Sequence, residues 1–320
     1  MDSKRYDRQI RVAQIGPTGQ ERLASSTVWI IGLGATGTYT AEQLTRTGVG
    51  HLLLVDDDLI ELSNLQRQSL YSEADLGQPK VLAAKEKLRA INSEIRLESF
   101  QETFDKFLFE EMAVTTKPDL VLDCTDNFLV RELINDYCRK ERLTFVFCAA
   151  AGTTGQVMAL NPTIGPCLSC VFPNLTALEQ SCETIGVVTP LIPLVSSLQV
   201  GLALRILTEP GFADWSSLRV VDVWGLEMSK FSIPKHCALC QNQPPEKVEL
   251  ESVCGGAFQA FFPDFDPEKF ANYCEQKTWP LKQNPIALAT ADITAFRSGR
   301  ILFYRADAKE IFKELKEILL

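Results

Sequence analysis

The sequence predicts an α/β protein built on a doubly wound, mostly parallel sheet, followed by a small C-terminal α+β appendix. Short apolar runs alternate with helical patterns through the first 150 residues, which is typical of parallel sheets covered by helices on both faces. A glycine-rich loop joins the first predicted strand to the helix after it. Beyond a Pro-Pro pair at 244–245 the elements become shorter. We therefore predict two domains, residues 1–248 and 249–320.

The predicted strands of the large domain are short, apolar and rich in β-branched or aromatic residues, and each is followed by a helical pattern. The strands are expected over residues 27–31, 51–55, 95–100, 120–124, 143–148 and 156–160. The helices between them are expected over residues 34–47, 79–90, 106–112 and 127–140. The second of these helices has proline in its first turn, a favoured position.

The pattern changes after residue 160. Residues 161–190 are rich in Pro, Gly, Thr and Cys, which predicts a long irregular crossover, and long loops in compact domains are usually functional. A buried apolar helix over residues 191–207 and a strand over 218–223 complete the large domain. Residues 306–320 have the apolar spacing of an amphipathic helix.

Composition excludes several classes of protein. The chain has 320 residues, 46% of them apolar and 23% charged, which rules out a disordered chain, a collagen and a coiled coil. Its net charge of −9 argues against a nucleic-acid surface. We expect no membrane span, because no run of about 18 apolar residues occurs. Residues 1–14 lack the apolar core of a signal peptide, so we expect a cytoplasmic protein without structural disulfides.

The glycine loop indicates a nucleotide site. Gly32, Gly34 and Gly37 form a G-x-G-x-x-G pattern between a strand and a helix, and Asp56 ends the next strand. Glycines let the backbone approach a phosphate at a helix N-terminus, and an acid in this position can bind a ribose hydroxyl. The pattern predicts an adenine nucleotide in a Rossmann-like crevice, but it does not distinguish NAD from ATP.

Further charged residues favour nucleotidyl transfer. Arg67 and Lys80 follow Asp56, and Asp126 follows the strand predicted over 120–124. Cations can neutralise a triphosphate and a carboxylate can hold Mg²⁺. A dehydrogenase needs no such set of charges around its cofactor.

Four short motifs resemble the ThiF/MoeB/HesA family, whose members are relatives of the ubiquitin-activating enzymes and adenylate ubiquitin-like sulfur carriers. They are Tyr-Asp-Arg-Gln at 6–9, Ser-Asn-Leu-Gln-Arg-Gln at 63–68, Gly-Gln-Pro-Lys at 77–80 and Asp-Cys-Thr-Asp-Asn at 123–127. They occur in the family's order over residues 6–240. Ala35 departs from the pattern, since many members carry a third glycine there.

The resemblance implies ATP and Mg²⁺ as ligands. Asp56 would bind the ribose, and Asp126 would hold Mg²⁺ with Asn127 beside the nucleotide. The other implied nucleotide contacts are Gly32, Gly34, Ala35, Gly37, Ser63, Asn64, Arg67 and Lys80. In the family the N-terminal arginine acts across a homodimer, so Arg8 would reach the partner's site.

The implied substrate is the C-terminal glycine of a ubiquitin-like sulfur carrier protein ending in Gly-Gly. Its carboxylate is already an anion at pH 7, so no general base is needed. The obstacle is repulsion by the α-phosphate, which Arg8, Arg67, Lys80 and Mg²⁺ would offset. The acyl-adenylate would then react with a sulfur donor such as a cysteine desulfurase.

Two C-x-x-C pairs predict a structural zinc site. Cys167 and Cys170 are separated by 66 residues from Cys237 and Cys240, a spacing that suits a clamp between distant segments. The resemblance implies zinc at these places. The alternatives are four unlinked thiols or a redox pair, although neither pair has a thioredoxin pattern.

The remaining cysteines are interpreted differently. Cys182 lies on the predicted crossover, and both a sulfur-handling catalytic role and a dispensable thiol stay open for it, because family members differ at this position. The others that we single out are expected in the core: Cys124, Cys138 and Cys148.

The C-terminal appendix resembles a small extra domain of some Gram-positive ThiF-like enzymes, with a similar turn at residues 296–301. We expect it to dock or pack, without chemistry of its own. It favours thiamin thiazole synthesis as the pathway over the same reaction on the molybdopterin synthase small subunit. Two hypotheses from other functional classes are an NAD-dependent oxidoreductase and a non-catalytic nucleotide-binding scaffold.

Overall fold

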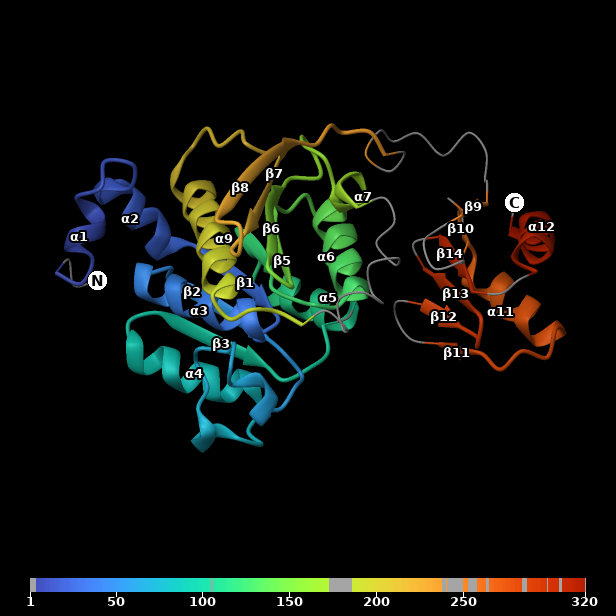
Figure 1. Cartoon of the computed structure of the whole chain (residues 1–320), viewed down its shortest axis with the longest axis horizontal. Helices are drawn as coiled ribbons and strands as arrows, with labels where there is room; N and C mark the ends of the chain where they lie inside the picture. The colour runs from blue at the N-terminus through green and yellow to red at the C-terminus, as the bar shows by residue number, and fades with distance from the viewer. Residues whose placement is uncertain are drawn as a thin grey trace.

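The described residues form two sheets, each with its own helices (Figure 1). This computed structural model describes residues 4–104, 106–172, 186–237, 240, 250–252, 258–262, 265–283, 287–297, 299–304 and 307–319. The N-terminal helices and the C-terminal unit lie at opposite ends of the molecule. The large sheet ends at Ser232 and the small one begins at Glu251. The predicted boundary at 248–249 therefore lies outside the described residues.

The large sheet has eight strands in the order β3-β2-β1-β4-β5-β6-β7-β8. Its strands are β1 (Thr27–Ile31), β2 (His51–Val55), β3 (Arg96–Phe100), β4 (Leu120–Asp123), β5 (Phe145–Ala151), β6 (Thr154–Leu160), β7 (Ser217–Asp222) and β8 (Glu227–Ser232). The pairs from β3 to β5 are parallel, and β6, β7 and β8 continue the sheet as antiparallel strands.

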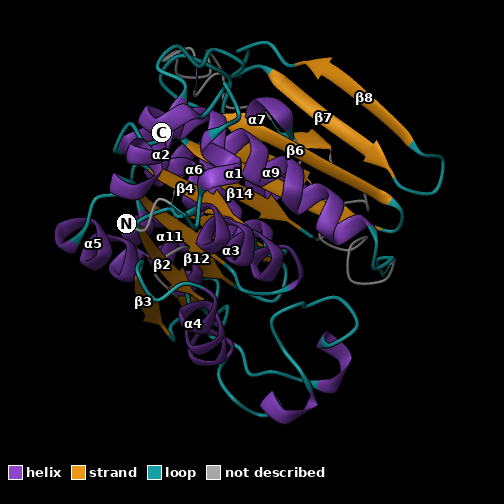
Figure 2. Cartoon of the chain, turned by 90° about the vertical axis from the view of Figure 1, so that its left-hand side faces the viewer, coloured by secondary structure: helices purple, strands orange, loops and turns teal. Residues whose placement is uncertain are grey.

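Helices cover both faces of the large sheet. They are α1 (Asp7–Ile10), α2 (Gly16–Ser25), α3 (Ala35–Thr47), α4 (Lys80–Ile91), α5 (Lys106–Thr115), α6 (Phe128–Lys140), α7 (Leu168–Val171) and α9 (Leu191–Thr208), with 3₁₀ turns η1 (Leu62–Asn64) and η2 (Glu73–Asp75). In Figure 2 α3 and α9 lie in front of the sheet, and β7 and β8 extend to one side.

Successive side chains of the central strand β1 point to opposite faces of the sheet, so the core has one part on each face. Val28 and Ile30 of β1 pack with residues of α3, α4 and α9, whereas Trp29 and Ile31 pack with α5 and α6. All four side chains are buried. A continuous apolar run therefore forms a strand that is covered on both faces, as the sequence predicts.

Helix α9 is, among the described residues, the one helix long and apolar enough to cross a membrane. Half of it is buried, and it packs against α3, β5 and β6. It is a core helix, and its bounds confirm the buried helix predicted over 191–207.

The C-terminal unit is an antiparallel sheet in the order β11-β12-β13-β14-β10-β9. Its elements are β9 (Glu251–Ser252), β10 (Phe258–Phe261), α11 (Pro267–Gln276), β11 (Lys282–Gln283), β12 (Ala287–Ala289), β13 (Ile293–Phe296), β14 (Arg300–Phe303) and α12 (Ala308–Leu319). The Asp266 side chain caps α11 by accepting from the N–H groups of Glu268 and Lys269. The apolar stripe of α12 is buried against this sheet, which confirms the predicted amphipathic helix.

An ion pair joins the two parts of the molecule. Arg300 of β14 donates to the Glu132 carboxylate of α6 over 2.6 Å, and both side chains are largely buried. Glu132 lies on α6 shortly after Asn127, so the C-terminal unit contacts the helix that follows the Asp-Cys-Thr-Asp-Asn motif.

Several elements of the large domain do not appear among the sequence predictions: α1, α2, α7, the two 3₁₀ turns and β8. Helix α2 begins with Gly-Pro-Thr-Gly, which resembles a turn. Strand β8 is exposed along its whole length, so it has no apolar run to mark it. The other predicted elements agree with the structure to within a few residues.

Candidate active site and four-thiol site

The glycine loop lies where the strand order reverses. The chain passes from β1 outward through β2 and β3, then returns to β4 on the other side of β1. Ligands of open α/β sheets bind at the carboxyl ends of the strands at such a point. The loop after β1, Asp56 after β2 and the motif after β4 all lie there. We call this place the glycine-loop edge: the carboxyl ends of β1, β2 and β4.

Two glycines of the loop are required by close backbone contacts. Gly32 has a φ of +91°, and a Cβ there would lie 2.9 Å from the Cys124 carbonyl oxygen. A Cβ on Gly37 would lie 2.0 Å from the Gly32 carbonyl oxygen. Larger residues would separate β1 from β4 or push helix α3 away. The glycines therefore bring the N-terminus of α3 close to the strand ends, where it can face an anion.

Leu33 of the loop is fixed from both sides. Its N–H donates to Asp56 Oδ2 over 2.6 Å, and its carbonyl accepts from the Tyr71 hydroxyl over 3.1 Å. The same hydroxyl lies 3.2 Å from the Lys80 carbonyl oxygen. Burial raises the pKa of Tyr71 far above its usual value. Tyr71 therefore stays a neutral donor that links the loop to the start of α4.

Lys80 carries its ammonium into a group of carboxylates. Its Nζ lies 2.6 Å from Asp58 Oδ2 and 4.0 Å from Asp56 Oδ1, and Lys80 is only 5% exposed. Burial raises the pKa of Asp56, although Lys80 acts in the opposite direction. The carboxylates of Asp56, Asp57 and Asp58 also lie within 4.8 Å of one another. A buried cation therefore stands at the glycine-loop edge, and its contact with a phosphate stays a prediction.

The Ser-Asn-Leu-Gln-Arg-Gln motif forms a capped turn around η1. The Asn64 side chain accepts from the Glu61 N–H, and Ser63 Oγ donates to the Glu61 carboxylate. Arg67 donates to the Ser63 carbonyl over 2.8 Å and is partly exposed. The turn thus holds the arginine close to its own backbone.

The motif after β4 rests on a buried ion pair. Arg131 Nε lies 2.8 Å from Asp123 Oδ2, and these side chains are 3% and 0% exposed. Asp123 also accepts from the N–H and hydroxyl of Thr125, and Arg131 donates to the Thr125 carbonyl. Burial raises the pKa of Asp123, whereas Arg131 acts to lower it. The pair fixes the backbone from which Asp126 projects.

Asp126 and Asn127 themselves are exposed. Asn127 Oδ1 accepts from the Val130 N–H at the start of α6. Asp126 thus has an exposed carboxylate at the glycine-loop edge, which is the property that a Mg²⁺ ligand requires.

The N-terminal motif has two anchors and one exposed cation. Tyr6 is buried against Gly48, and its hydroxyl accepts from Asn92 Nδ2 over 2.8 Å. Gln9 donates to the Thr47 carbonyl. These contacts hold α1 at the C-terminal end of α3, which is about 20 Å from its N-terminal end at 1.5 Å per residue. Arg8 is exposed there, far from the glycine loop of its own chain.

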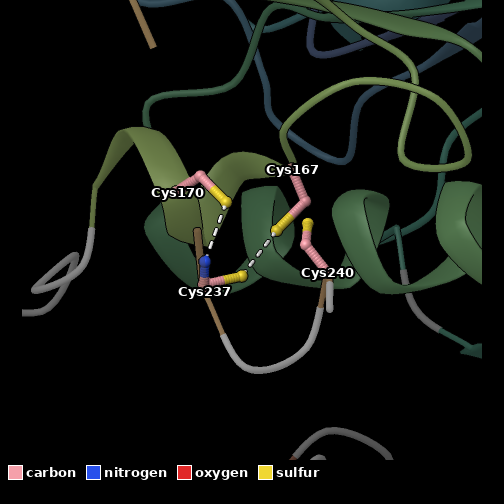
Figure 3. Close-up of side chains that lie close together, drawn as sticks. All are labelled: Cys167, Cys170, Cys237 and Cys240. Carbon is pink, nitrogen blue, oxygen red and sulfur yellow. Dashed lines mark hydrogen bonds between the residues drawn. The ribbon is translucent and has the colours of Figure 1, made fainter. Parts of the chain in front are cut away.

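The second site unites the two C-x-x-C pairs (Figure 3). We call it the four-thiol site: Cys167, Cys170, Cys237 and Cys240. Their Sγ atoms all lie within 4.8 Å of one another, and those of Cys167 and Cys237 are 3.5 Å apart. Sulfurs bound about 2.3 Å from one zinc ion lie about 3.8 Å apart in a tetrahedron. The arrangement fits zinc and is too wide for a disulfide.

The thiols of the four-thiol site interact strongly with one another. Hydrogen bonds from the Cys237 and Cys240 thiols lower the pKa of Cys167, and the same contacts raise the pKa of Cys237 and Cys240. A thiolate is the form that binds a metal. The Cys237 N–H also points to Cys170 Sγ over 3.4 Å, and Asn135 of α6 accepts from the Leu168 N–H beside the first pair. The site therefore ties the segment after β8 to α7 and α6.

The other cysteines divide as expected where the structure describes them. Cys124, Cys138 and Cys148 are buried, which confirms their assignment to the core. Cys182 lies outside the described residues, so its role stays a prediction. Sequence reasoning did not single out Gln68, Tyr71 or Arg131. The first stands in a quoted motif, but the contacts of all three are visible only after folding.

Fold and sites together define an α/β protein with the glycine loop of a nucleotide site and a cluster of four cysteines that fits zinc. Comparison with known proteins gives the family: residues 6–242 match the ThiF family, and the chain belongs to it. It is an adenylyltransferase. The NAD-dependent oxidoreductase considered from the glycine pattern is therefore not supported.

Similar curated proteins extend this result. The sulfur carrier protein ThiS adenylyltransferase of Bacillus subtilis is 32% identical over 96% of this chain and 98% of that one. The Escherichia coli protein of the same name is 38% identical over 65% of this chain and 82% of that one. The Escherichia coli molybdopterin-synthase adenylyltransferase is 35% identical over 74% of this chain and 95% of that one. A match over 96% of the chain includes most of the C-terminal unit.

Solved structures confirm the fold. Escherichia coli MccB in complex with AMPCPP and MccA superposes with a TM-score of 0.66 at 20% identity, covering 75% of each chain. At this identity the likeness concerns the fold alone. It agrees with the predicted α/β architecture of the large domain.

Proposed function

We propose that the chain uses ATP to adenylate the C-terminal glycine of a ubiquitin-like sulfur carrier protein, with the thiamin-pathway carrier as its substrate. The observation that carries the proposal is the glycine-loop edge of a ThiF-family chain, where buried Lys80 lies beside Asp56 and exposed Asp126 follows the neighbouring strand β4. The thiamin pathway is favoured because a relative named for ThiS matches the chain through its C-terminal unit. The relative named for molybdopterin synthase makes that carrier the second candidate.

The first task of the site is to hold ATP. The N-terminus of α3 favours the negative charge of the phosphates, and Gly32, Gly34, Ala35 and Gly37 let them approach the backbone. Asp56 would bind the ribose with the oxygen that does not accept from Leu33. Ser63 and Asn64 would contact the phosphates once the η1 turn adjusts, and Asn127 would lie beside the nucleotide.

The second task is to let two anions react. The carrier's terminal carboxylate attacks the α-phosphorus, and pyrophosphate leaves with the electron pair of the broken P–O bond. Lys80 and Arg67 would offset the charge of the phosphates and of the leaving group. Both cations are held in the structure by local acceptors, Asp58 and the Ser63 carbonyl, and would exchange these for phosphate oxygens. Mg²⁺, held by Asp126, would supply further charge neutralisation.

Arg8 would complete the site of a second subunit in a homodimer. Tyr6 and Gln9 hold α1 about 20 Å, the length of α3, from the glycine loop of the same chain. An exposed arginine at that distance serves a neighbouring subunit better than its own. Mixing an Arg8→Ala chain with an Asp126→Ala chain should restore part of the activity that each has lost. Heterodimers that form but remain inactive would contradict a shared site.

Zinc in the four-thiol site would be structural, because all four ligand positions are taken by thiolates. After adenylation, a persulfide donor such as a cysteine desulfurase would supply sulfur to the carrier, and Cys182 is the candidate for handling it. We place these steps in the cytoplasm, without nucleic-acid or membrane partners.

Exchange of labelled pyrophosphate into ATP tests the proposal. Exchange should require a carrier, and it should be lost with a carrier that lacks its last glycine. The thiamin-type carrier should support faster exchange than the molybdopterin-type carrier. Equal exchange with both would contradict the pathway, and no exchange with either would contradict the reaction.

A further inference from the structure

Gln68 is a buried polar residue whose side chain lacks a hydrogen bond. It is 3% exposed, and among the described residues no donor reaches its Oε1 atom. Buried polar atoms are almost always paired, because an unmade hydrogen bond in the interior is costly. An unpaired carboxamide beside a ligand site therefore points to a group whose N–H finds an acceptor only when the ligand is present.

The carboxamide of Gln68 lies against the glycine loop. Its Nε2 is 3.8 Å from the position of a Cβ on Gly34, and apart from the chain neighbours of Gly34 it is the one described atom within 4 Å of that position. Gly34 precedes α3, whose N-terminal N–H groups face the phosphate site. The side chain thus points to the part of the loop that a phosphate would approach.

The backbone around Gln68 is fixed at both ends. Its N–H donates to the Asn64 carbonyl, and its carbonyl accepts from the Tyr71 N–H. The next N–H, that of Ser69, donates to Thr38 Oγ1 on α3. The carboxamide is therefore held beside the loop by the main chain and not by contacts of its own oxygen.

A second buried glutamine shows what a structural role looks like in the same domain. Gln199 of α9 donates to the carbonyls of Asp123 and Val146 and accepts from Thr40 and Cys124. Both ends of its carboxamide are paired. Gln68 differs because its oxygen is not.

We propose that Gln68 is a nucleotide-binding residue whose carboxamide donates a hydrogen bond to a phosphate oxygen held over Gly34. This inference rests on the proposed use of ATP. The Nε2 atom already faces Gly34 and has no acceptor among the described residues, so it can donate to a phosphate oxygen without a turn of the carboxamide. Gln68 thus joins Arg67 and Lys80 in contacting the phosphates, but as a neutral donor.

The test uses Gln68→Met, which keeps length and removes the donors, together with Gln68→Glu, which keeps an acceptor and adds a charge. Binding of ATP and of adenosine to the full chain is measured by calorimetry, and the melting temperature is measured without nucleotide. Gln68→Met should weaken ATP binding by about tenfold or more, the scale of one hydrogen bond to a charged group. Adenosine binding should not change, and Gln68→Glu should weaken ATP binding further.

The melting temperature separates this role from a structural one. Gln68→Met should melt at or above the wild-type temperature, because it removes an unpaired group, whereas Gln199→Met should melt clearly lower. Exposed Gln78→Met is the matched control and should change neither quantity.

Two results would overturn the inference. One is ATP binding by Gln68→Met at the wild-type affinity. The other is an equal loss of ATP and adenosine binding, which would place the contact on the base or the ribose. A wild-type chain that binds no ATP would contradict the proposed function itself, so the two failures can be distinguished.

Discussion

The glycine-loop edge and the four-thiol site lie in one domain but are held together differently. The glycine-loop edge is fixed by backbone contacts and buried side chains, such as those of Gly32 and Tyr71. The four-thiol site joins segments 66 residues apart, and its sulfurs lie near one another without bonds strong enough to keep them there. The first site is therefore built by the sheet, whereas we expect the second to need an ion. Loss of the metal should loosen the four-thiol site and leave the glycine-loop edge in place.

Loss of zinc should have the largest effect. Purified protein should contain about one zinc ion per chain, since four thiolates complete one tetrahedral site. Cys237→Ser should lower the metal content and the melting temperature together, because structural zinc contributes about 10–16 kcal/mol in small zinc peptides. Metal analysis and thermal unfolding measure this. Cys138→Ala, a buried thiol outside the site, should keep its zinc, and full zinc occupancy in a Cys237→Ser, Cys240→Ser chain would contradict the assignment.

Breaking the buried Asp123–Arg131 ion pair under the glycine-loop edge should have the second largest effect on stability. Asp123→Asn leaves the Arg131 charge buried without its partner, which should cost about 3–5 kcal/mol of unfolding free energy. Urea unfolding measures the loss. Replacing both partners, as Asp123→Asn with Arg131→Gln, should recover part of it. A single variant as stable as the wild type would mean that the pair does not hold the loop.

The Tyr71 hydroxyl should contribute less to the free energy of unfolding than the Asp123–Arg131 pair does. Tyr71→Phe keeps the ring and removes the donor to the Leu33 carbonyl, so we expect a loss of about 1–3 kcal/mol. The zinc content should be unchanged, because this contact belongs to the glycine-loop edge. Unchanged stability would show that water replaces the hydroxyl there.

The smallest expected effect concerns the link to the C-terminal unit. Arg300→Ala and Glu132→Ala should each destabilise the chain by about 1 kcal/mol, and a double-mutant cycle should give a coupling energy of similar size. The pair is only partly exposed, so added salt should weaken the coupling modestly. Zero coupling would mean that other contacts position the unit.

The sequence predicts those features of the two sites that are local patterns along the chain. The glycine loop, Asp56, Lys80 and the two C-x-x-C pairs are local patterns, so the chain order reveals them before the fold is known. Helix α3 and strand β1 follow from short apolar runs with glycine between them. Helix α3, strand β1 and the clustering of the four cysteines agree with the structure, whereas the roles of the glycine loop, Asp56 and Lys80 stay predictions.

Other features depend on contacts that no local pattern records. The pairing of Asp123 with Arg131 and the orphaned oxygen of Gln68 arise only when distant elements pack. The place of Arg8 at the far end of α3 depends on how Tyr6 meets Gly48. Strand β8 is missed because an exposed edge strand needs no apolar residues to pair with β7.

The central claim is that the glycine-loop edge transfers a nucleotide with the help of Asp126. Asp126→Asn keeps the size of an exposed side chain and removes its charge, so the chain should fold normally and still bind ATP. Carrier-dependent exchange of pyrophosphate into ATP, measured side by side with the wild type, should fall by about 10² or more, the scale of losing one electrostatic contact to the transition state. Exchange at the wild-type rate would contradict the account and leave Asp126 as an exposed acid ahead of the helix cap at Asn127.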